Sequence, residues 1–279
     1  MATEIKIDAL LPSGMAKKAE YIGISKSEMS FLDTLLLSVV AGGFIALGAV
    51  FATTVAAGQA GEVPFGITKL LVGLVFSLGL ILVVVAGAEL FTGNNLIMMA
   101  WASRKVSTLC LLRNWGIVYL GNFLGSIGTV ALMFYSRQYR FGGGIIGRTA
   151  LSIANGKVNL EFTQAIFLGI LCNMLVCLAV WLTFSARSTT DKILAVIFPI
   201  TAFVAAGFEH SVANMFFVPM GIFIKNLDPA FAAASGLDLS NLTWNAFLLH
   251  NLIPVTIGNI IGGSILVAGV YWMIYLRGE

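Results

Sequence analysis

The chain has 279 residues, of which 58% are hydrophobic and only 10% are charged, and its formal net charge is +3. Soluble domains carry about 25% charged residues, so this composition excludes an ordinary soluble domain and indicates a polytopic membrane protein. The small net charge gives no indication of a nucleic-acid partner. The three cysteines show neither a paired framework nor metal-ligand spacing, so we expect no metal or cofactor there and interpret them as small core residues: Cys110, Cys172, Cys177.

The N-terminal segment, residues 1–30, is mixed in charge and lacks the basic-then-apolar layout of a signal peptide. Apolar residues at near-helical spacing between Leu10 and Ile24 predict a short amphipathic helix at the membrane surface. A frayed cytoplasmic tail is the alternative.

Six apolar segments are long enough to cross a bilayer as helices, which takes about 20 residues. The predicted fold class is therefore an all-α polytopic membrane protein with six transmembrane spans. We expect one channel domain over residues 31–276 and a C-terminus at 277–279. The distribution of Lys and Arg favours both termini in the cytoplasm. The six segments are Phe31–Ala57, Phe65–Trp101, Leu109–Tyr135, Glu161–Phe184, Ile193–Ile224 and Trp244–Leu276.

The second and fifth segments are too long for one straight span, and both carry a polar interruption. Residues 86–94 and 206–214 share the motif A-G-x-E-x-x-x-x-N, and a G-N-x-x-G motif follows each of them at 121–125 and 258–262. Matched motifs in the same order indicate an internal repeat. Each repeat holds three spans, an odd number, so the repeat must be inverted.

Interruptions at corresponding positions of two halves point to a transport site. A broken helix leaves backbone groups that only protein or a water-filled cavity can satisfy, and its half-helix N-terminus favours an anion. His210 lies at the second break, where it can donate a hydrogen bond or a proton to an anion. Thr92, at the first break, offers a hydroxyl that can bond His210. The alternative for His210 is a satisfied structural histidine.

Glu89 and Glu209 occupy equivalent positions in the two motifs. We expect each carboxylate to cap backbone N–H groups freed by its break; a proton relay is the alternative. Asn94 and Asn214 receive the same structural interpretation. Large apolar residues near the breaks are either core packing or, if the breaks line a pore, its dewetted constrictions: Phe76, Leu80, Leu90, Phe91, Phe203.

The residues of these motifs resemble those of the formate/nitrite transporter family, and within it they are most similar to bacterial formate channels. The resemblance covers nearly the whole chain. It rests on the sequences V-P-F-G, F-S-L-G-L, E-L-F-T, G-F-E-H-S-V-A-N-M and I-P-V-T-I-G-N, which occupy residues 63–66, 76–80, 89–92, 207–215 and 253–259.

This resemblance implies an aquaporin-like protomer in a homopentamer of the bacterial inner membrane, with one pore per protomer. It implies passage of formate, alone or with a proton, and no enzyme activity; a nitrite or hydrosulfide channel is the alternative. Thr92 and His210 would form the central polar site, and the N-terminal segment would take part in pH-dependent gating. Val176 would join the constrictions, and three residues would guide the anion: Lys157, Asn173, Asn259.

Two other classes fit the chain less well. Ammonium channels usually use paired pore histidines, and a membrane haem needs paired intramembrane histidines. The chain has two histidines, and of these only His210 lies at membrane depth, since His250 precedes the core of the last apolar segment. Aquaporin Asn-Pro-Ala boxes are absent from the sequence.

Overall fold

The fold is taken from a computed structural model, which describes residues 9–58 and 62–278; all regular elements in those residues are helices. Five of these helices are long and apolar enough to cross a membrane. The last of them is continuous but includes two π-helical stretches. Four are α2 (Phe31–Ala56), α3 (Phe65–Ala86), α5 (Thr108–Tyr135) and α7 (Phe162–Ser185), and the fifth joins α11 (Trp244–Ala246), η3 (Phe247–Leu252), α12 (Ile253–Ile260), η4 (Ile261–Gly269) and α13 (Val270–Tyr275).

The second and fifth apolar segments are broken, as predicted. After α3 the chain leaves the helix and resumes in η1 (Gly93–Ile97) and α4 (Met98–Ala102). The fifth segment is divided into α8 (Thr189–Ala205) and α9 (Ser211–Leu227), each of 17 residues. Because neither half is long enough to count as a span by itself, the total of six spans remains a prediction.

Glycine explains why the two helices stop where they do. Gly87 follows α3 with φ of 79°, and Gly207 lies just beyond α8 with φ of 76°. This left-handed conformation is open to glycine at little cost and commonly ends a helix. Each broken segment is then anchored to a neighbouring helix, because Glu89 N donates to Leu37 O at 3.3 Å and Glu209 N donates to Leu168 O at 3.2 Å.

The helices of the two repeats pack in the same way, with glycines at the helix contacts. α2 lies against α5, and α7 lies against α12 and η4. A Cβ atom on Gly125 would clash with the Val39 carbonyl, and one on Gly262 would clash with the Ile170 carbonyl. The glycines of the G-N-x-x-G motifs therefore let the helix backbones approach closely.

The predicted N-terminal helix is present as α1 (Pro12–Glu28). It does not lie apart from the channel, since Ala16, Ala19 and Gly23 are buried and α1 packs on η1 and α4. Small residues on this face allow the close approach. Contact of its outer face with the bilayer remains a prediction.

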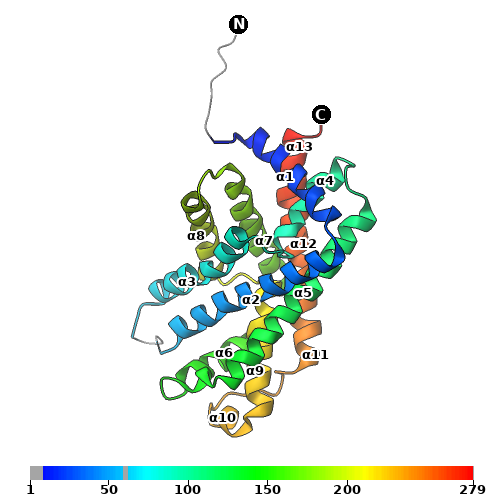
Figure 1. The fold of residues 1–279 in the computed structure, drawn as a ribbon. Coiled ribbons are helices and arrows are strands. Elements are labelled where there is room, and N and C mark those ends of the chain that lie inside the picture. Colours follow the sequence, from blue (N-terminus) through cyan, green and yellow to red (C-terminus); the bar gives the residue numbers. More distant parts are fainter. Residues whose placement is uncertain (1–8, 59–61, 279) are drawn as a thin grey trace.

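A helix that the sequence did not reveal, α6 (Ile145–Val158), occupies the matching place in the second half and packs on α9. It is too short and too polar to register as a span. Figure 1 shows α1 and α13 together at one end of the molecule, and α6 near α10 (Pro229–Ala233) toward the other. The remaining short element is η2 (Gln138–Arg140), between α5 and α6.

Candidate functional site

The two breaks meet at Thr92 and His210, which are 118 residues apart in the chain. Thr92 Oγ1 lies 2.9 Å from His210 Nε2, and both residues are buried. His210 is also the N-cap of α9, because its Nδ1 accepts a hydrogen bond from Ala213 N at 3.0 Å. The sequence prediction that this hydroxyl and this imidazole can bond is therefore realised in the geometry.

The cap decides which imidazole nitrogen carries the proton. Since Nδ1 accepts from a backbone N–H, a neutral His210 has its proton on Nε2. Nε2–H then donates to Thr92 Oγ1. The Thr92 hydroxyl group is left free to donate its own hydrogen bond to another acceptor. A second proton on His210 would require release of the Ala213 N–H from Nδ1.

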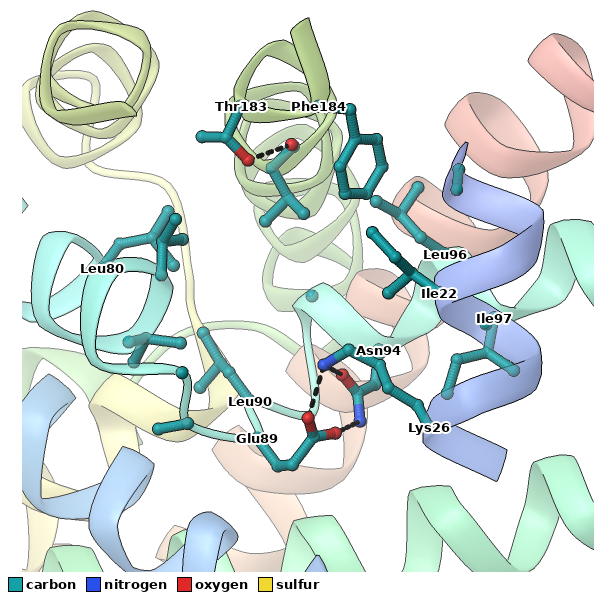
Figure 2. Close-up of a pocket in the computed structure, with 18 of the residues that line it drawn as sticks. Ile22, Lys26, Leu80, Glu89, Leu90, Asn94, Leu96, Ile97, Thr183 and Phe184 are labelled. Carbon is teal, nitrogen blue, oxygen red and sulfur yellow. Dashed lines mark hydrogen bonds and ion pairs between the residues drawn. The ribbon is translucent and has the colours of Figure 1, made fainter. Parts of the chain in front are cut away.

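Two cavities flank this pair. The first, here called the α1-side cavity, has a volume of ≈ 290 Å³ and is lined by Lys18, Lys26 and Lys192 together with Leu80 and Leu90. Figure 2 shows Leu80 and Leu90 on one side of it and Lys26 from α1 on the other. It brings α1 into the wall of the candidate site.

The second, here called the α6-side cavity, has a volume of ≈ 300 Å³. It is lined by Lys69 and Lys157, by Phe76 and Phe203, and by His210 itself. Thus both cavities combine lysine with large apolar side chains, and the histidine opens toward the second.

A partly buried ion pair lies in the α1-side cavity, at the first break. Lys26 Nζ lies 2.6 Å from Glu89 Oε1 and 2.9 Å from Asn94 Oδ1, and Asn94 Nδ2 donates to Glu89 Oε2 at 2.7 Å. Asn114 completes the cluster, because its Oδ1 accepts from Asn94 at 2.9 Å and its Nδ2 donates to Lys26 O at 3.1 Å. Figure 2 shows Lys26, Glu89 and Asn94 converging.

The second break carries the same arrangement. Lys157 Nζ lies 2.8 Å from Glu209 Oε1, and Asn214 Nδ2 donates to Glu209 Oε2 at 2.7 Å. Asn251 Oδ1 accepts from Asn214 at 2.7 Å, and Asn251 Nδ2 donates to Lys157 O at 3.0 Å. Both glutamates therefore bind lysine and asparagine side chains, and not the freed backbone N–H groups that the sequence led us to expect.

Backbone groups at the breaks are satisfied by two other asparagines. Asn122 Oδ1 accepts from Phe91 N at 2.9 Å, and Asn122 Nδ2 donates to Glu89 O at 2.9 Å. Asn259 repeats this with Ser211 N and Glu209 O, both at 2.9 Å. Asn259 is fully buried, so its amide holds the break; the predicted role in guiding an anion remains a prediction.

The predicted constriction residues separate into two pairs. Leu80 and Leu90 line the α1-side cavity, and Phe76 and Phe203 line the α6-side cavity. The Phe203 ring stacks on the His210 ring with centroids 5.9 Å apart, and Phe76 meets Phe203 edge-on at 5.8 Å. One apolar pair thus adjoins each cavity.

Three other predicted residues are buried outside the linings of both cavities: Phe91, Val176 and Asn173. The Phe91 ring packs on Tyr119, with centroids 4.8 Å apart. Asn173 Nδ2 donates to Asn259 O at 2.7 Å and to Thr92 O at 3.3 Å. Their predicted roles in the pore remain predictions.

Three residues of the two clusters could not be predicted from the sequence: Lys26, Asn114 and Asn251. Lys26 precedes Glu89 by 63 residues, whereas Lys157 precedes Glu209 by 52. Because the helices and turns between these residues differ in length, no fixed spacing marks the two lysines as equivalent. Asn114 follows Asn94 by 20 residues, whereas Asn251 follows Asn214 by 37. This pair of asparagines could not be recognised as equivalent for the same reason.

Comparison with known proteins identifies the family. A family model described as formate/nitrite transporter matches residues 13–273. The chain belongs to the formate/nitrite transporter family. Members of this family similar to the chain include the formate channel FocA of Escherichia coli strain K12, which is 47% identical over 99% of this chain and 98% of its own. The formate channel FocA of Haemophilus influenzae is 43% identical over 94% and 93%.

A solved structure of the family has the same fold. The structure described as a pentameric formate channel with formate bound superposes with a TM-score of 0.83 at 49% identity, and the match covers 88% of this chain and 98% of that chain. The fold of this chain is therefore that of the formate/nitrite transporter family.

Proposed function

We propose that the protein carries formate across the bacterial inner membrane, as a homopentamer with a pore in each protomer. Formate channels are among its relatives, and a pentameric formate channel shares its fold. We further propose six spans with both termini in the cytoplasm. The Lys and Arg distribution supports this orientation. The position of α1 and α13 at one end of the molecule supports that both termini share a side (Figure 1).

The path runs from the α1-side cavity past Leu80 and Leu90 to Thr92 and His210, and then past Phe76 and Phe203 to the α6-side cavity. The Thr92–His210 pair between two lysine-lined cavities is the observation that carries the proposal. Lysines in both cavities attract an anion and repel ammonium. The apolar pairs remove its water, which is expensive for a bare anion.

At the centre the Thr92 hydroxyl replaces part of the lost hydration. His210 Nε2–H bonds the hydroxyl oxygen, so the hydroxyl proton points to the incoming carboxylate. Formate resembles a side-chain carboxyl with pKa near ~4, so it is anionic at neutral pH. The proposal includes passage alone or with a proton. For passage with a proton, His210 would first take a second proton from solvent on Nδ1, with release of the Ala213 N–H. It would then pass its Nε2 proton to Thr92 Oγ1 while the Thr92 hydroxyl proton moves to formate, so that formic acid leaves and His210 is neutral again.

The N-terminal segment, residues 1–30, belongs to the gate in this proposal, and residues 31–276 form the channel. Within α1, Lys18 and Lys26 line the α1-side cavity. Lys26 is paired with Glu89, and Glu20 is paired with Lys105. Loss of either ion pair would weaken the hold on α1, and we propose that this segment takes part in pH-dependent gating.

Flux into proteoliposomes tests the function. Vesicles containing the protein should admit formate faster than protein-free vesicles, and ammonium should enter both at the same rate. Nitrite and hydrosulfide measured in parallel rank the related anions. The Thr92→Val variant is compared with the wild type, because it removes the central hydroxyl group. Valine already stands at the equivalent position of the other repeat, Val212. Ammonium uptake without formate uptake would overturn the proposal.

A further inference from the structure

A third polar cavity lies outside the proposed pore, at the end of the molecule where α1, α4 and α13 come together (Figure 1). Its volume is ≈ 600 Å³. Its polar lining comes from Glu20 of α1, from Ser103, Arg104 and Lys105 in the turn after α4, and from Trp272 and Arg277 at the end of the chain's last helix. No residue of this lining belongs to the α1-side or α6-side cavity.

The charges of this cavity do not cancel. Three cationic side chains face one carboxylate, and that carboxylate is already engaged, because Lys105 Nζ lies 2.5 Å from Glu20 Oε2. The guanidinium groups of Arg104 and Arg277 make no hydrogen bond or ion pair with any described residue. The cavity therefore presents two uncompensated cations of the kind that match phosphate oxygens in a two-pronged geometry.

Backbone and tryptophan hydrogen bonds hold the turn that carries Arg104 against the end of the last helix. Arg104 has φ of 60°, a left-handed conformation that non-glycine residues rarely adopt and that costs energy to hold. The turn is fixed by Lys105 N, which donates to Ala100 O at 3.0 Å. Trp272 Nε1 donates to Ser103 Oγ at 3.0 Å and so ties the last helix to the same turn. Arg104 and Arg277 therefore line the same cavity from two segments that a hydrogen bond connects.

Exposed apolar side chains lie on α13, the helix that also carries Trp272 of the cavity lining. Met273 and Ile274 follow Trp272 in the chain and are 52% and 61% exposed, on other faces of the helix than Trp272. A tryptophan at the end of an apolar helix, followed by exposed apolar side chains, is typical of the membrane interface. A ligand that fits both features has an anionic head and apolar tails. We propose that this cavity binds the phosphodiester headgroup of an anionic phospholipid, with the acyl chains along α13.

Lipid retention measured by native mass spectrometry tests the site. The full-length protein is purified in detergent and titrated with phosphatidylglycerol, with phosphatidylcholine as the zwitterionic reference and with inorganic phosphate as a competitor. The variant is Arg104→Asn with Arg277→Gln, since asparagine tolerates a positive φ. Arg137→Asn is the matched control, because Arg137 is also exposed and has φ of 57°, at the far end of α5.

We expect the wild type and Arg137→Asn to bind phosphatidylglycerol in preference to phosphatidylcholine. The double variant should bind it about tenfold or more weakly, since each cation near an anionic lipid contributes about 1 kcal/mol and 1.4 kcal/mol is tenfold. If the double variant fails to fold, Arg277→Gln alone should show part of the loss. Equal losses in the double variant and Arg137→Asn would overturn the proposal. Displacement of the lipid by millimolar phosphate would overturn it in favour of a soluble phosphate site.

Discussion

At the residue scale, the buried glutamates at the two helix breaks are each held in a paired cluster. The side chains of Lys157 and Glu209 are 16% and 7% exposed, and those of Lys26 and Glu89 are 26% and 5% exposed. Asparagine side chains take the remaining carboxylate oxygen in both clusters. Each lysine therefore contributes positive charge to the lining of its cavity and also neutralises the glutamate at a helix break.

Replacing Lys157 by methionine should destabilise the protein by about 3–5 kcal/mol, because Glu209 is left as a buried charge without its cation. Thermal unfolding of the purified protein, followed by intrinsic fluorescence, measures the loss. Lys157→Met combined with Glu209→Gln should recover much of it. Arg148→Met is the control, since Arg148 is exposed and bonds the backbone oxygen of Gly143, and an exposed substitution of this kind should change stability by under about 1 kcal/mol. Equal losses in Lys157→Met and Arg148→Met would contradict this account.

His210→Asn separates the structural role of the histidine from its chemical role. Asparagine is a good N-cap, so its oxygen can accept from Ala213 N as Nδ1 does, and the fold should survive. Asparagine cannot titrate near neutral pH, whereas imidazole titrates near ~6.5 unperturbed. We expect lower formate flux and a flatter dependence of flux on pH in proteoliposomes. A wild-type pH profile in the folded variant would limit His210 to capping and packing.

At the element scale, glycine in the left-handed conformation ends α3 at the first break. Gly87→Ala should cost about 1–2 kcal/mol, since an L-residue at this φ is strained while no atom lies within 4 Å of the added Cβ. Gly116→Ala is the matched control: it lies inside α5, it also has open space around its Cβ, and it should be neutral or stabilising. Differential scanning fluorimetry of both variants compares them directly. A similar change in both would show that backbone strain is not what matters at Gly87.

The repeat motifs made the broken helices predictable, because the glycine that ends α3 and the asparagine that bonds the glutamate lie within one nine-residue motif, residues 86–94. Long-range partners were not predictable in the same way. Lys26 and Asn114 reach Glu89 and Asn94 only through packing between helices far apart in the chain. α6 stayed hidden because a short helix buried against α9 needs no continuous apolar run. Phe76 and Leu80 were recognisable as large apolar residues, but their assignment to different cavities required the fold.

At the scale of the whole molecule, the inverted repeat fixes which parts of the chain share a side of the membrane. The turn at Gly143 precedes α6, and the last helix ends near α1 (Figure 1). Reporter domains fused at Gly143 or after Gly278 should therefore report opposite sides, with the C-terminal fusion in the cytoplasm. An alkaline phosphatase and a fluorescent protein at each position form the reciprocal control. The same side for both fusions would contradict the inverted arrangement.

The two cavities are alike in size and in their lysine–glutamate clusters, but they are not equal in charge. The α1-side cavity holds three lysines against Glu89, whereas the α6-side cavity holds two against Glu209. An anion in the α1-side cavity is therefore attracted more strongly than an anion in the α6-side cavity. Under equal formate concentrations on both faces, the current–voltage curve of a single pore should be mildly rectifying, with the larger anion current leaving from the α1 side. Raising the ionic strength should screen the extra charge and bring the two branches of the curve together.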